Sequence, residues 1–119
     1  MRSAAELAAA QLAAYNAKDL DAFCACYSDD VVVLKLPNTT PALVGKDQFR
    51  ANYVATFANP VIQAHVPTRL PLGKTQCLDH EICVRSADPS VPPMELMVMY
   101  EAKDDRIIKA TFFFRNDNA

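Results

Sequence analysis

The order of hydrophobic patterns along the chain predicts an α+β domain, in which three N-terminal helices pack on a mainly antiparallel sheet. Up to residue 57, apolar side chains recur at helical spacing, interrupted by one β-branched run. From Val61 onward this period is lost, and apolar runs alternate with turns rich in proline, glycine and aspartate. The 119 residues have the usual length of one domain, so we expect a single domain over residues 1–119.

Two helices are predicted at the start of the chain. Residues 3–17 place alanine, leucine and tyrosine side chains at the i, i+3 and i+4 positions of one helical face. Asp19 is a typical N-cap. It predicts a second, short helix that ends near residues 28–30.

A strand and a third helix follow. The β-branched run Val31–Leu36 predicts the first strand, and residues 37–41, with two prolines, predict a loop. The third helix is expected to begin after Gly45 and to end at Pro60. Its apolar stripe consists of Phe49, Tyr53 and Phe57.

The second half of the chain predicts a four-stranded meander. Pro67 and Pro71 confine the first of these strands to a sheet edge or a bulge. Residues 103–105 join the last two strands as a hairpin. The four expected strands cover residues 61–70, 77–85, 94–102 and 106–115.

The composition is that of an ordinary globular protein, with 51% hydrophobic and 22% charged residues. The net charge of −2 provides no basic face for nucleic acid, and no run approaches the ~20 apolar residues of a membrane span. Gly45 and Gly73 are the only glycines, which excludes glycine-rich loops for nucleotide phosphates. We therefore expect neither nucleic acid nor a membrane as a partner.

The cysteines and the N-terminus carry further expectations. The four cysteines lack zinc-site and CxxC spacing, and no other group of potential ligands has metal-binding spacing, so we expect no metal and no cofactor. Glu6 and Gln11 interrupt the apolar stretch at the N-terminus, which is typical of a mature helix and not of a signal peptide. We therefore predict that the four cysteines are buried and reduced, and that the protein is cytoplasmic.

Five segments of the chain form a recognisable set: Tyr15–Phe23, Tyr27–Val33, Leu43–Asp47, Asp79–Glu81 and Tyr100–Ile107. Together they resemble the nuclear transport factor 2-like superfamily, and within it the SnoaL-like, steroid delta-isomerase-like branch. The resemblance covers nearly the whole chain. It implies a cone-shaped fold, in which a strongly curved sheet wraps around the first helix and encloses an apolar pocket. Members of the superfamily include enzymes and non-catalytic modules, so function must be argued from the site.

The resemblance also allows a test of the steroid isomerase template. Those enzymes use a carboxylate base and two hydrogen-bond donors for the enolate oxygen. The matching positions here are Gln11, Lys35 and Met97. An ammonium does not replace the base and a thioether does not donate, so we expect no ketosteroid isomerase activity by the usual residues. Gln11 remains a candidate donor in the pocket.

His80 is the candidate catalytic residue. It alternates with Leu78 and Ile82, which predicts that it projects from the apolar face of its strand into the cone. Asp79 and Glu81 would then face the opposite side. An inward imidazole serves either as an acid–base group of the pocket or as a core histidine bonded to a backbone carbonyl or a tyrosine.

Four residues besides Gln11 are candidates for the pocket wall. Lys35 interrupts an aliphatic strand, and its ammonium lies either at the rim or inside the pocket. Tyr15 and Tyr53 belong to helical stripes that line the cone in this fold. Met97 belongs to a methionine-rich strand that offers an adaptable apolar wall. For the tyrosines and the methionine, plain core packing is the alternative.

Three consecutive phenylalanines, Phe112–Phe114, place aromatic rings on both faces of the last strand. A strand with one face in solvent would not carry them. We therefore expect the outer face of the sheet to pack against a second copy in a homodimer, which the resemblance also implies.

Two functions remain open from the sequence. In the first, the protein binds a small apolar or polycyclic molecule and converts it without a cofactor, as an isomerase, cyclase or lyase with His80 as the acid–base group. In the second, the chain is a non-catalytic ligand-binding or dimerisation module. The missing carboxylates of the isomerase template weigh against the first function, and the predicted inward histidine favours it.

Overall fold

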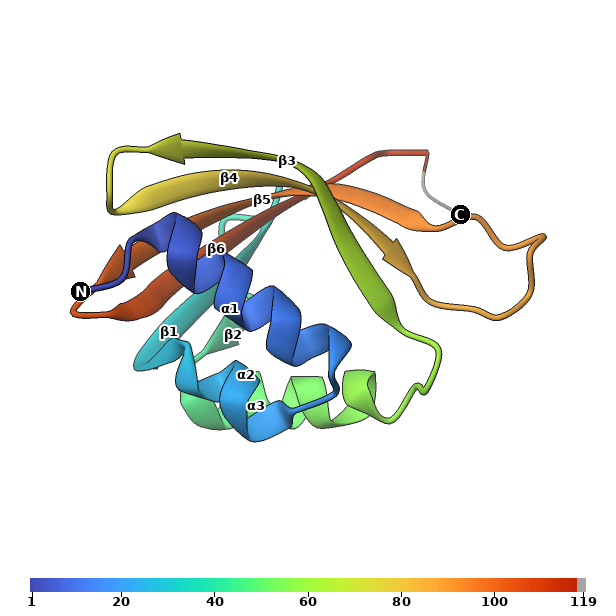
Figure 1. The fold of residues 1–119 in the computed structure, drawn as a ribbon, viewed down its shortest axis with the longest axis horizontal. Coiled ribbons are helices and arrows are strands. Elements are labelled where there is room, and N and C mark those ends of the chain that lie inside the picture. Colours follow the sequence, from blue (N-terminus) through green and yellow to red (C-terminus); the bar gives the residue numbers. More distant parts are fainter. Residues whose placement is uncertain (118–119) are drawn as a thin grey trace.

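The computed structural model describes residues 1–117, which form three helices and one six-stranded sheet (Figure 1). The expected domain over residues 1–119 includes residues 118 and 119, which lie outside the described residues. In chain order the elements are α1 (Ala4–Asn16), α2 (Leu20–Ala25), β1 (Tyr27–Leu36), β2 (Leu43–Val44), α3 (Lys46–Phe57), β3 (Gln63–Leu72), β4 (Gln76–Val84), β5 (Met94–Lys103) and β6 (Arg106–Phe114).

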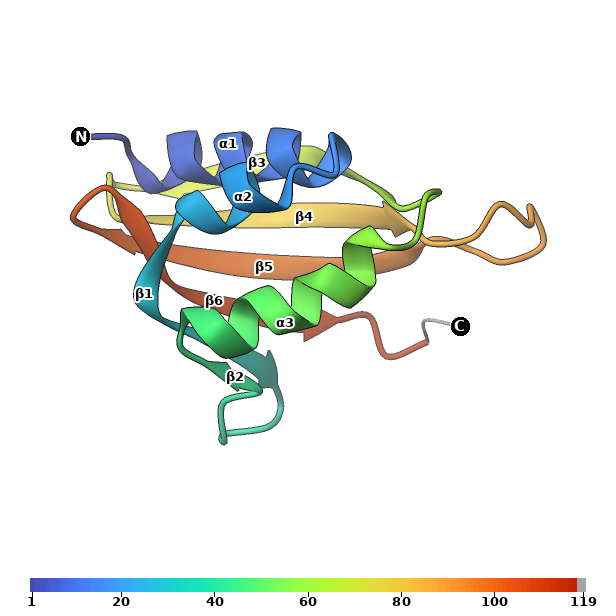
Figure 2. The ribbon, with the colours of Figure 1, turned by 90° about the horizontal axis from the view of Figure 1, so that it is seen from below.

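The strands lie in the order β2-β1-β6-β5-β4-β3. Neighbours are antiparallel except β1 and β6, which are parallel, so the prediction of a mainly antiparallel sheet with a four-stranded meander is confirmed. The sheet curves around α1, while α2 and α3 lie across its open side (Figures 1 and 2). This arrangement gives the sheet a concave inner face, toward the helices, and an outer face.

Local sequence signals account for the ends of several elements. The Ser3 hydroxyl accepts a hydrogen bond from the backbone of Glu6, and the Glu6 carboxylate accepts one from the backbone of Ser3, which forms a capping box at the start of α1. Asp19 caps α2 as predicted, because its carboxylate accepts from the backbone of Ala22 at 3.1 Å. Asp104 and Asp105 have positive φ angles of 52° and 61°, as a tight turn between β5 and β6 requires.

The first strand differs from its prediction. β1 begins at Tyr27 and not at Val31, since the chain already pairs with β6 at Tyr27 opposite Ile107. The pairing is irregular between Tyr27 and Val32, and this bulge holds the exposed Asp29 and Asp30. Polar residues that predict the end of a helix thus lie within a strand.

The edges of the sheet are short or interrupted. β3 is an edge strand, as its prolines predict, and its pairing with β4 shifts between His65 and Thr68. The opposite edge strand, β2, has two residues and pairs only with Val32 and Val33, so the pattern of the sequence does not reveal it. The end of β1 beyond Val33 is therefore not covered by a further strand.

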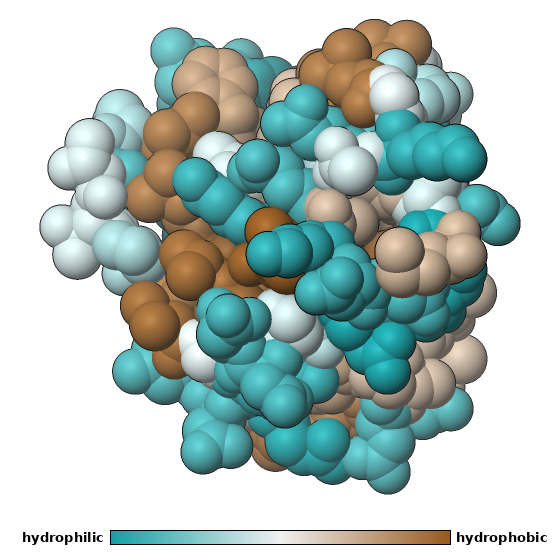
Figure 3. All heavy atoms as spheres, turned by 90° about the vertical axis from the view of Figure 1, so that its left-hand side faces the viewer, coloured by the Kyte–Doolittle hydropathy of each residue, from teal (hydrophilic) through white to brown (hydrophobic). Residues whose placement is uncertain are grey.

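The core lies between the three helices and the inner face of the sheet, and its largest fully buried side chains include Phe23, Phe49 and Leu7. All four cysteines are buried and unpaired. No helix formed by residues 1–117 has the length and apolar character needed to cross a bilayer. Seen from the end that carries the N-terminus, the surface is mostly hydrophilic, with hydrophobic side chains gathered in separate patches (Figure 3).

Candidate functional site

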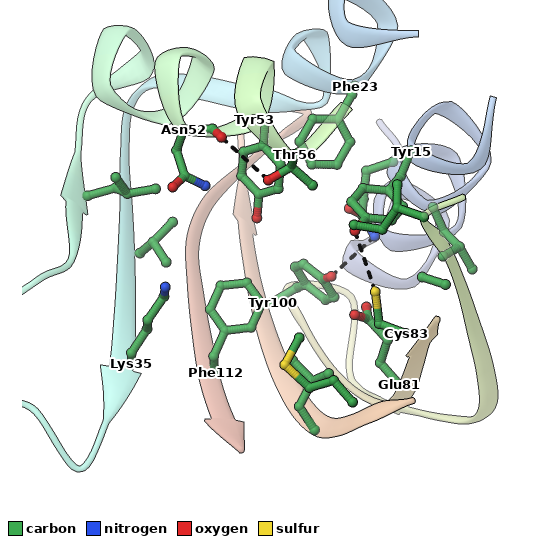
Figure 4. Close-up of a pocket in the computed structure, with 18 of the residues that line it drawn as sticks. Tyr15, Phe23, Lys35, Asn52, Tyr53, Thr56, Glu81, Cys83, Tyr100 and Phe112 are labelled. Carbon is green, nitrogen blue, oxygen red and sulfur yellow. Dashed lines mark hydrogen bonds between the residues drawn. The ribbon is translucent and has the colours of Figure 1, made fainter. Parts of the chain in front are cut away.

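A cavity of about 200 Å³ lies between the helices and the inner face of the sheet (Figure 4). Side chains from the three helices and from all six strands line it. Its wall combines aliphatic and aromatic groups with a few polar ones. The polar residues that matter for chemistry are Gln11, Tyr15, Lys35, Tyr53, Glu81 and Tyr100.

Glu81 places a carboxyl group in this cavity. It lies on the inner face of β4, opposite Leu96 of β5, and its carboxyl group makes no hydrogen bond or ion pair with any of residues 1–117. Burial, with a smaller contribution from the nearby Asp79 carboxyl group, raises the pKa of Glu81 from 4.5 to about 7. At neutral pH the group is therefore able both to accept and to donate a proton.

A chain of hydrogen bonds runs across the floor of the cavity. The Tyr27 hydroxyl donates to Gln11 Oε1 at 2.8 Å, and Gln11 Nε2 donates to the Tyr100 hydroxyl oxygen at 3.2 Å. Burial raises the pKa of both tyrosines well above 10, so both hydroxyls keep their protons. Because Tyr100 accepts from Gln11 and has no acceptor of its own within residues 1–117, its O–H is available to a bound molecule.

Two further tyrosines border the same space. The hydroxyl of Tyr15, on α1, lies 3.6 Å from Cys83 Sγ. Tyr53, on α3, directs its hydroxyl toward the cavity (Figure 4) and makes no hydrogen bond within the described chain. Its ring packs against Phe23 with a centroid distance of 4.7 Å, so the predicted stripe on α3 forms part of the wall. Burial raises the pKa of Tyr15 and of Tyr53.

A buried ion pair lies next to Glu81 but outside the cavity lining. Asp79 is fully buried and receives two hydrogen bonds from Arg69, one from Nε at 2.7 Å and one from Nη2 at 2.9 Å. The partner of Asp79 is thus a guanidinium in a two-point geometry. Glu81, two residues along the same face, has no such partner.

The cavity is lined by four of the predicted pocket residues: Gln11, Tyr15, Lys35 and Tyr53. The structure brings them together from α1, β1 and α3. Lys35 lies at the rim, since it is exposed. Their role in ligand binding stays a prediction.

The expectation that His80 projects into the cavity is wrong. His80 lies on the outer face of the sheet, where its Nε2 is 2.5 Å from a carboxylate oxygen of Glu95, and Glu95 also accepts from Arg115 at 2.7 Å. The expected position of Met97 is wrong for the same reason, because Met97 pairs with His80 across the strands and shares its face. Both residues border a shallow groove of about 240 Å³ on that outer face.

The error has a physical cause. The more hydrophobic phase of β4 consists of Leu78, His80 and Ile82. These residues face outward, because the outer face of this sheet also carries apolar side chains, among them Met97, Met99 and Phe113. The inner phase consists of Cys77, Asp79, Glu81 and Cys83. One signal in the sequence indicates the correct phase: cysteine is among the most completely buried residue types, and both cysteines of this strand share the phase of Glu81. Sequence reasoning therefore missed Glu81, the main titratable group of the cavity.

Within residues 1–117, no group of three or more histidine, cysteine, aspartate or glutamate side chains is arranged to hold a metal ion. The groups in the cavity that are able to donate a hydrogen bond or move a proton include the carboxyl group of Glu81, the tyrosine hydroxyls and the amide of Gln11.

Comparison with known proteins identifies the family. The model of the SnoaL-like domain family matches residues 8–110, which confirms the resemblance drawn from the sequence. No curated protein matches the chain.

Solved structures share the fold. An uncharacterised cystatin-fold protein from Novosphingobium aromaticivorans is 26% identical, with a TM-score of 0.81 over 94% of this chain and 98% of its own. A candidate ketosteroid isomerase from Kribbella flavida is 14% identical, with a TM-score of 0.77 over 95% of this chain and 78% of its own. A candidate polyketide cyclase from Pseudomonas putida is 19% identical, with a TM-score of 0.72 over 99% and 96%. The similarity to the isomerase and to the cyclase shows a shared fold and nothing more.

Proposed function

Since the chain belongs to the SnoaL-like family of the nuclear transport factor 2-like superfamily, we propose that its cavity binds a small cyclic ketone and that Glu81 moves a proton on it. The observation that carries this proposal is the position of the Glu81 carboxyl group, which faces the cavity without a partner among residues 1–117. A buried, unpaired carboxyl group is costly to the fold, and functional sites are where such groups concentrate.

The size of the cavity favours a ligand of one or two rings. An apolar cavity of about 150 Å³ holds benzene, and the cavity here has about 200 Å³. A molecule of four fused rings would have to displace side chains or extend through the mouth. The proposed ligand is therefore smaller than a steroid.

The geometry supports proton abstraction next to a carbonyl group. In its ionised form Glu81 accepts a proton from the carbon beside the carbonyl, and the electrons of that C–H bond form the double bond of an enolate while the carbonyl π electrons pass to oxygen. The O–H of Tyr100 donates to that oxygen, with Gln11 holding the tyrosine in place. Return of the proton to the same carbon completes an exchange, and its return to a conjugated carbon shifts a double bond. No other reactant is needed.

Hydrogen exchange of 2-tetralone, a two-ring ketone, tests this proposal. In D₂O the wild-type protein should accelerate exchange of the protons beside the carbonyl, as followed by NMR. Glu81→Gln should slow the catalysed exchange by at least ~100-fold, the usual contribution of a general base. His80→Gln is the matched control, because it changes the neighbouring residue on the opposite face of β4, and it should leave the rate unchanged.

The same experiment separates catalysis from binding. If 2-tetralone binds but wild-type protein does not accelerate exchange, the chain is a non-catalytic ligand-binding module and the proposed role of Glu81 is wrong. If Glu81→Gln retains the full rate, the base is another group. The rate should rise with pH and level off above about 7, where Glu81 is ionised.

We also propose that two copies pair through the outer face of the sheet. One row of cross-strand partners on this face includes Phe113, which is 58% exposed and lies beside the groove that it lines together with Met97. An exposed ring next to a groove on one face suits twofold pairing, because each copy offers both the ring and the groove. The row comprises Thr68, His80, Met97, Phe113 and Leu36.

A second row lies beside the first and adds apolar area. Both rows cross five strands, a width of about 19 Å at ~4.8 Å per strand. Contiguous apolar patches of this kind are typical of association surfaces. The second row comprises Leu70, Leu78, Met99, Thr111 and Leu34.

A further inference from the structure

Taken together, the charged residues that line the cavity differ in sign from the net charge of the protein. The chain carries a net charge of −2, yet the charged residues that line the cavity are two bases, Lys35 and Arg85, and one acid, Glu81. When Glu81 is protonated, the Lys35 ammonium leaves a positive charge in the lining. Clefts with one sign of charge and low-dielectric walls concentrate ligands of the opposite sign.

Lys35 is the charge with the clearest geometry. It lies on β1 beyond the two residues that β2 covers, so its side chain is at the open edge of the sheet. Figure 4 shows its ammonium directed into the cavity, on the side opposite Glu81. The Lys35 ammonium makes no hydrogen bond or ion pair with any of residues 1–117, although the protein contains 14 acidic residues.

The two charged side chains face each other across the inner face of the sheet. Lys35 is on β1 and Glu81 on β4, with β6 and β5 between them. Three strand spacings correspond to about 14 Å between the backbones, and the curvature of the sheet and the length of both side chains shorten the gap between the charged groups. Phe112 lies opposite Lys35 on β6 and, with Tyr100, occupies the wall between them (Figure 4).

From this arrangement we infer that the ligand carries an anionic group, such as a carboxylate, which binds Lys35 at the mouth while the ring extends over Phe112 toward Glu81. This inference rests on the proposed function and specifies its substrate class: a cyclic keto acid and not a neutral ketone. Lys35 would then be a binding residue that determines which end of the ligand reaches Glu81.

Two probes of equal shape test the inference. 2-Naphthoate carries the carboxylate, and 2-naphthamide replaces it with a neutral group of nearly the same size. Titration followed by calorimetry should show that wild-type protein at low ionic strength binds 2-naphthoate at least tenfold more tightly. Raising the salt concentration to ~0.5 M should reduce this preference, because the Lys35 charge is exposed to screening.

Variants of the protein test whether Lys35 causes the preference for 2-naphthoate over 2-naphthamide. Lys35→Met should weaken binding of 2-naphthoate at least tenfold and change binding of 2-naphthamide less than twofold, and Lys35→Arg should retain most of the preference. Lys74→Met, in the exposed turn between β3 and β4, is the matched control for loss of one positive charge and should bind both probes as the wild type does.

The outcomes distinguish the inference from the function on which it rests. Equal binding of the two probes by wild-type protein, or an equal loss of both in Lys35→Met, would overturn the anionic ligand and leave the cavity as a binding site. If neither probe binds to the wild-type protein, both the inference and the proposed binding pocket are wrong. The role of Glu81 is decided separately, by the exchange of 2-tetralone.

Discussion

At the scale of single residues, the inner face of β4 holds two carboxyl groups in very different states. Asp79 receives two hydrogen bonds from Arg69, whereas Glu81 has no partner within residues 1–117. The same strand thus gives one carboxyl group a guanidinium partner, while burial without a partner raises the pKa of the other to about 7. A carboxyl group with a pKa near neutrality is suited to acid–base chemistry.

The raised pKa of Glu81 predicts a stability effect that depends on pH. Between its ordinary pKa of 4.5 and about 7, the folded protein keeps a proton that the unfolded chain has released, so the free energy of unfolding falls as pH rises through this window. Glu81→Gln carries no charge at any pH. It should therefore exceed the wild type in free energy of unfolding by about 1–3 kcal/mol at pH 8, and by much less at pH 5.

Urea denaturation at pH 5, 6, 7 and 8 measures this difference, with both proteins at one concentration. All titratable groups other than Glu81 are present in both proteins, so their contributions cancel in the comparison. A difference that does not change with pH would show that Glu81 is ionised throughout. The charged or titratable groups that share its surroundings are Tyr15 of α1, Tyr27 and Lys35 of β1, Tyr53 of α3, Asp79 and Cys83 of β4, Tyr100 of β5, and Arg85, which follows β4.

At the scale of elements, local patterns in the sequence predict the helices and the meander to within a few residues, because helical spacing, caps and prolines act over short distances. The start of β1 and the existence of β2 depend on pairing between distant segments, such as Tyr27 with Ile107, and no local pattern reveals them. The prediction of which β4 residues face the cavity is wrong, because the more hydrophobic phase of this strand lies on the outer face of the sheet. Gln11 and Tyr53 were predicted from the family resemblance and the helical stripes, whereas Glu81 required the correct strand phase.

The ion pair between β3 and β4 should contribute strongly to stability. Asp79 has no exposed surface and Arg69 is 23% exposed, so removing the guanidinium leaves an unpaired buried charge. Arg69→Met should lower the free energy of unfolding by about 3 kcal/mol. The exposed pair of Arg50 and Asp21, with side chains 47% and 85% exposed, is the control: Arg50→Met should lower the free energy of unfolding far less than Arg69→Met does.

Denaturation with urea at neutral pH compares the two variants. Arg69→Met combined with Asp79→Asn should recover part of the loss, because the unpaired charge is then gone while the lost packing remains. If Arg69→Met and Arg50→Met lower the free energy of unfolding equally, the buried ion pair contributes no more to stability than the exposed one.

At the scale of the whole molecule, the sheet separates two surfaces with different properties. Its inner face, with the helices, encloses the cavity and Glu81, and its outer face carries the two apolar rows and the groove beside Phe113. Side chains alternate between the faces along each strand, so substitutions on one face leave the other largely intact. Association of two copies and binding in the cavity should therefore be separable by mutation.

The oligomeric state tests this separation. Wild-type protein at micromolar concentration should sediment as a species of twice 13.1 kDa, and Phe113→Lys should sediment as a monomer, since it places an ammonium within the apolar outer face. Val54→Lys is the matched control: Val54 is 53% exposed on α3, away from that face, and its variant should remain a dimer. Phe113→Lys should still bind 2-naphthamide, because the cavity lies on the other side of the sheet. A monomeric wild type, or a Phe113→Lys protein that sediments like Val54→Lys, would show that the outer face does not join two copies.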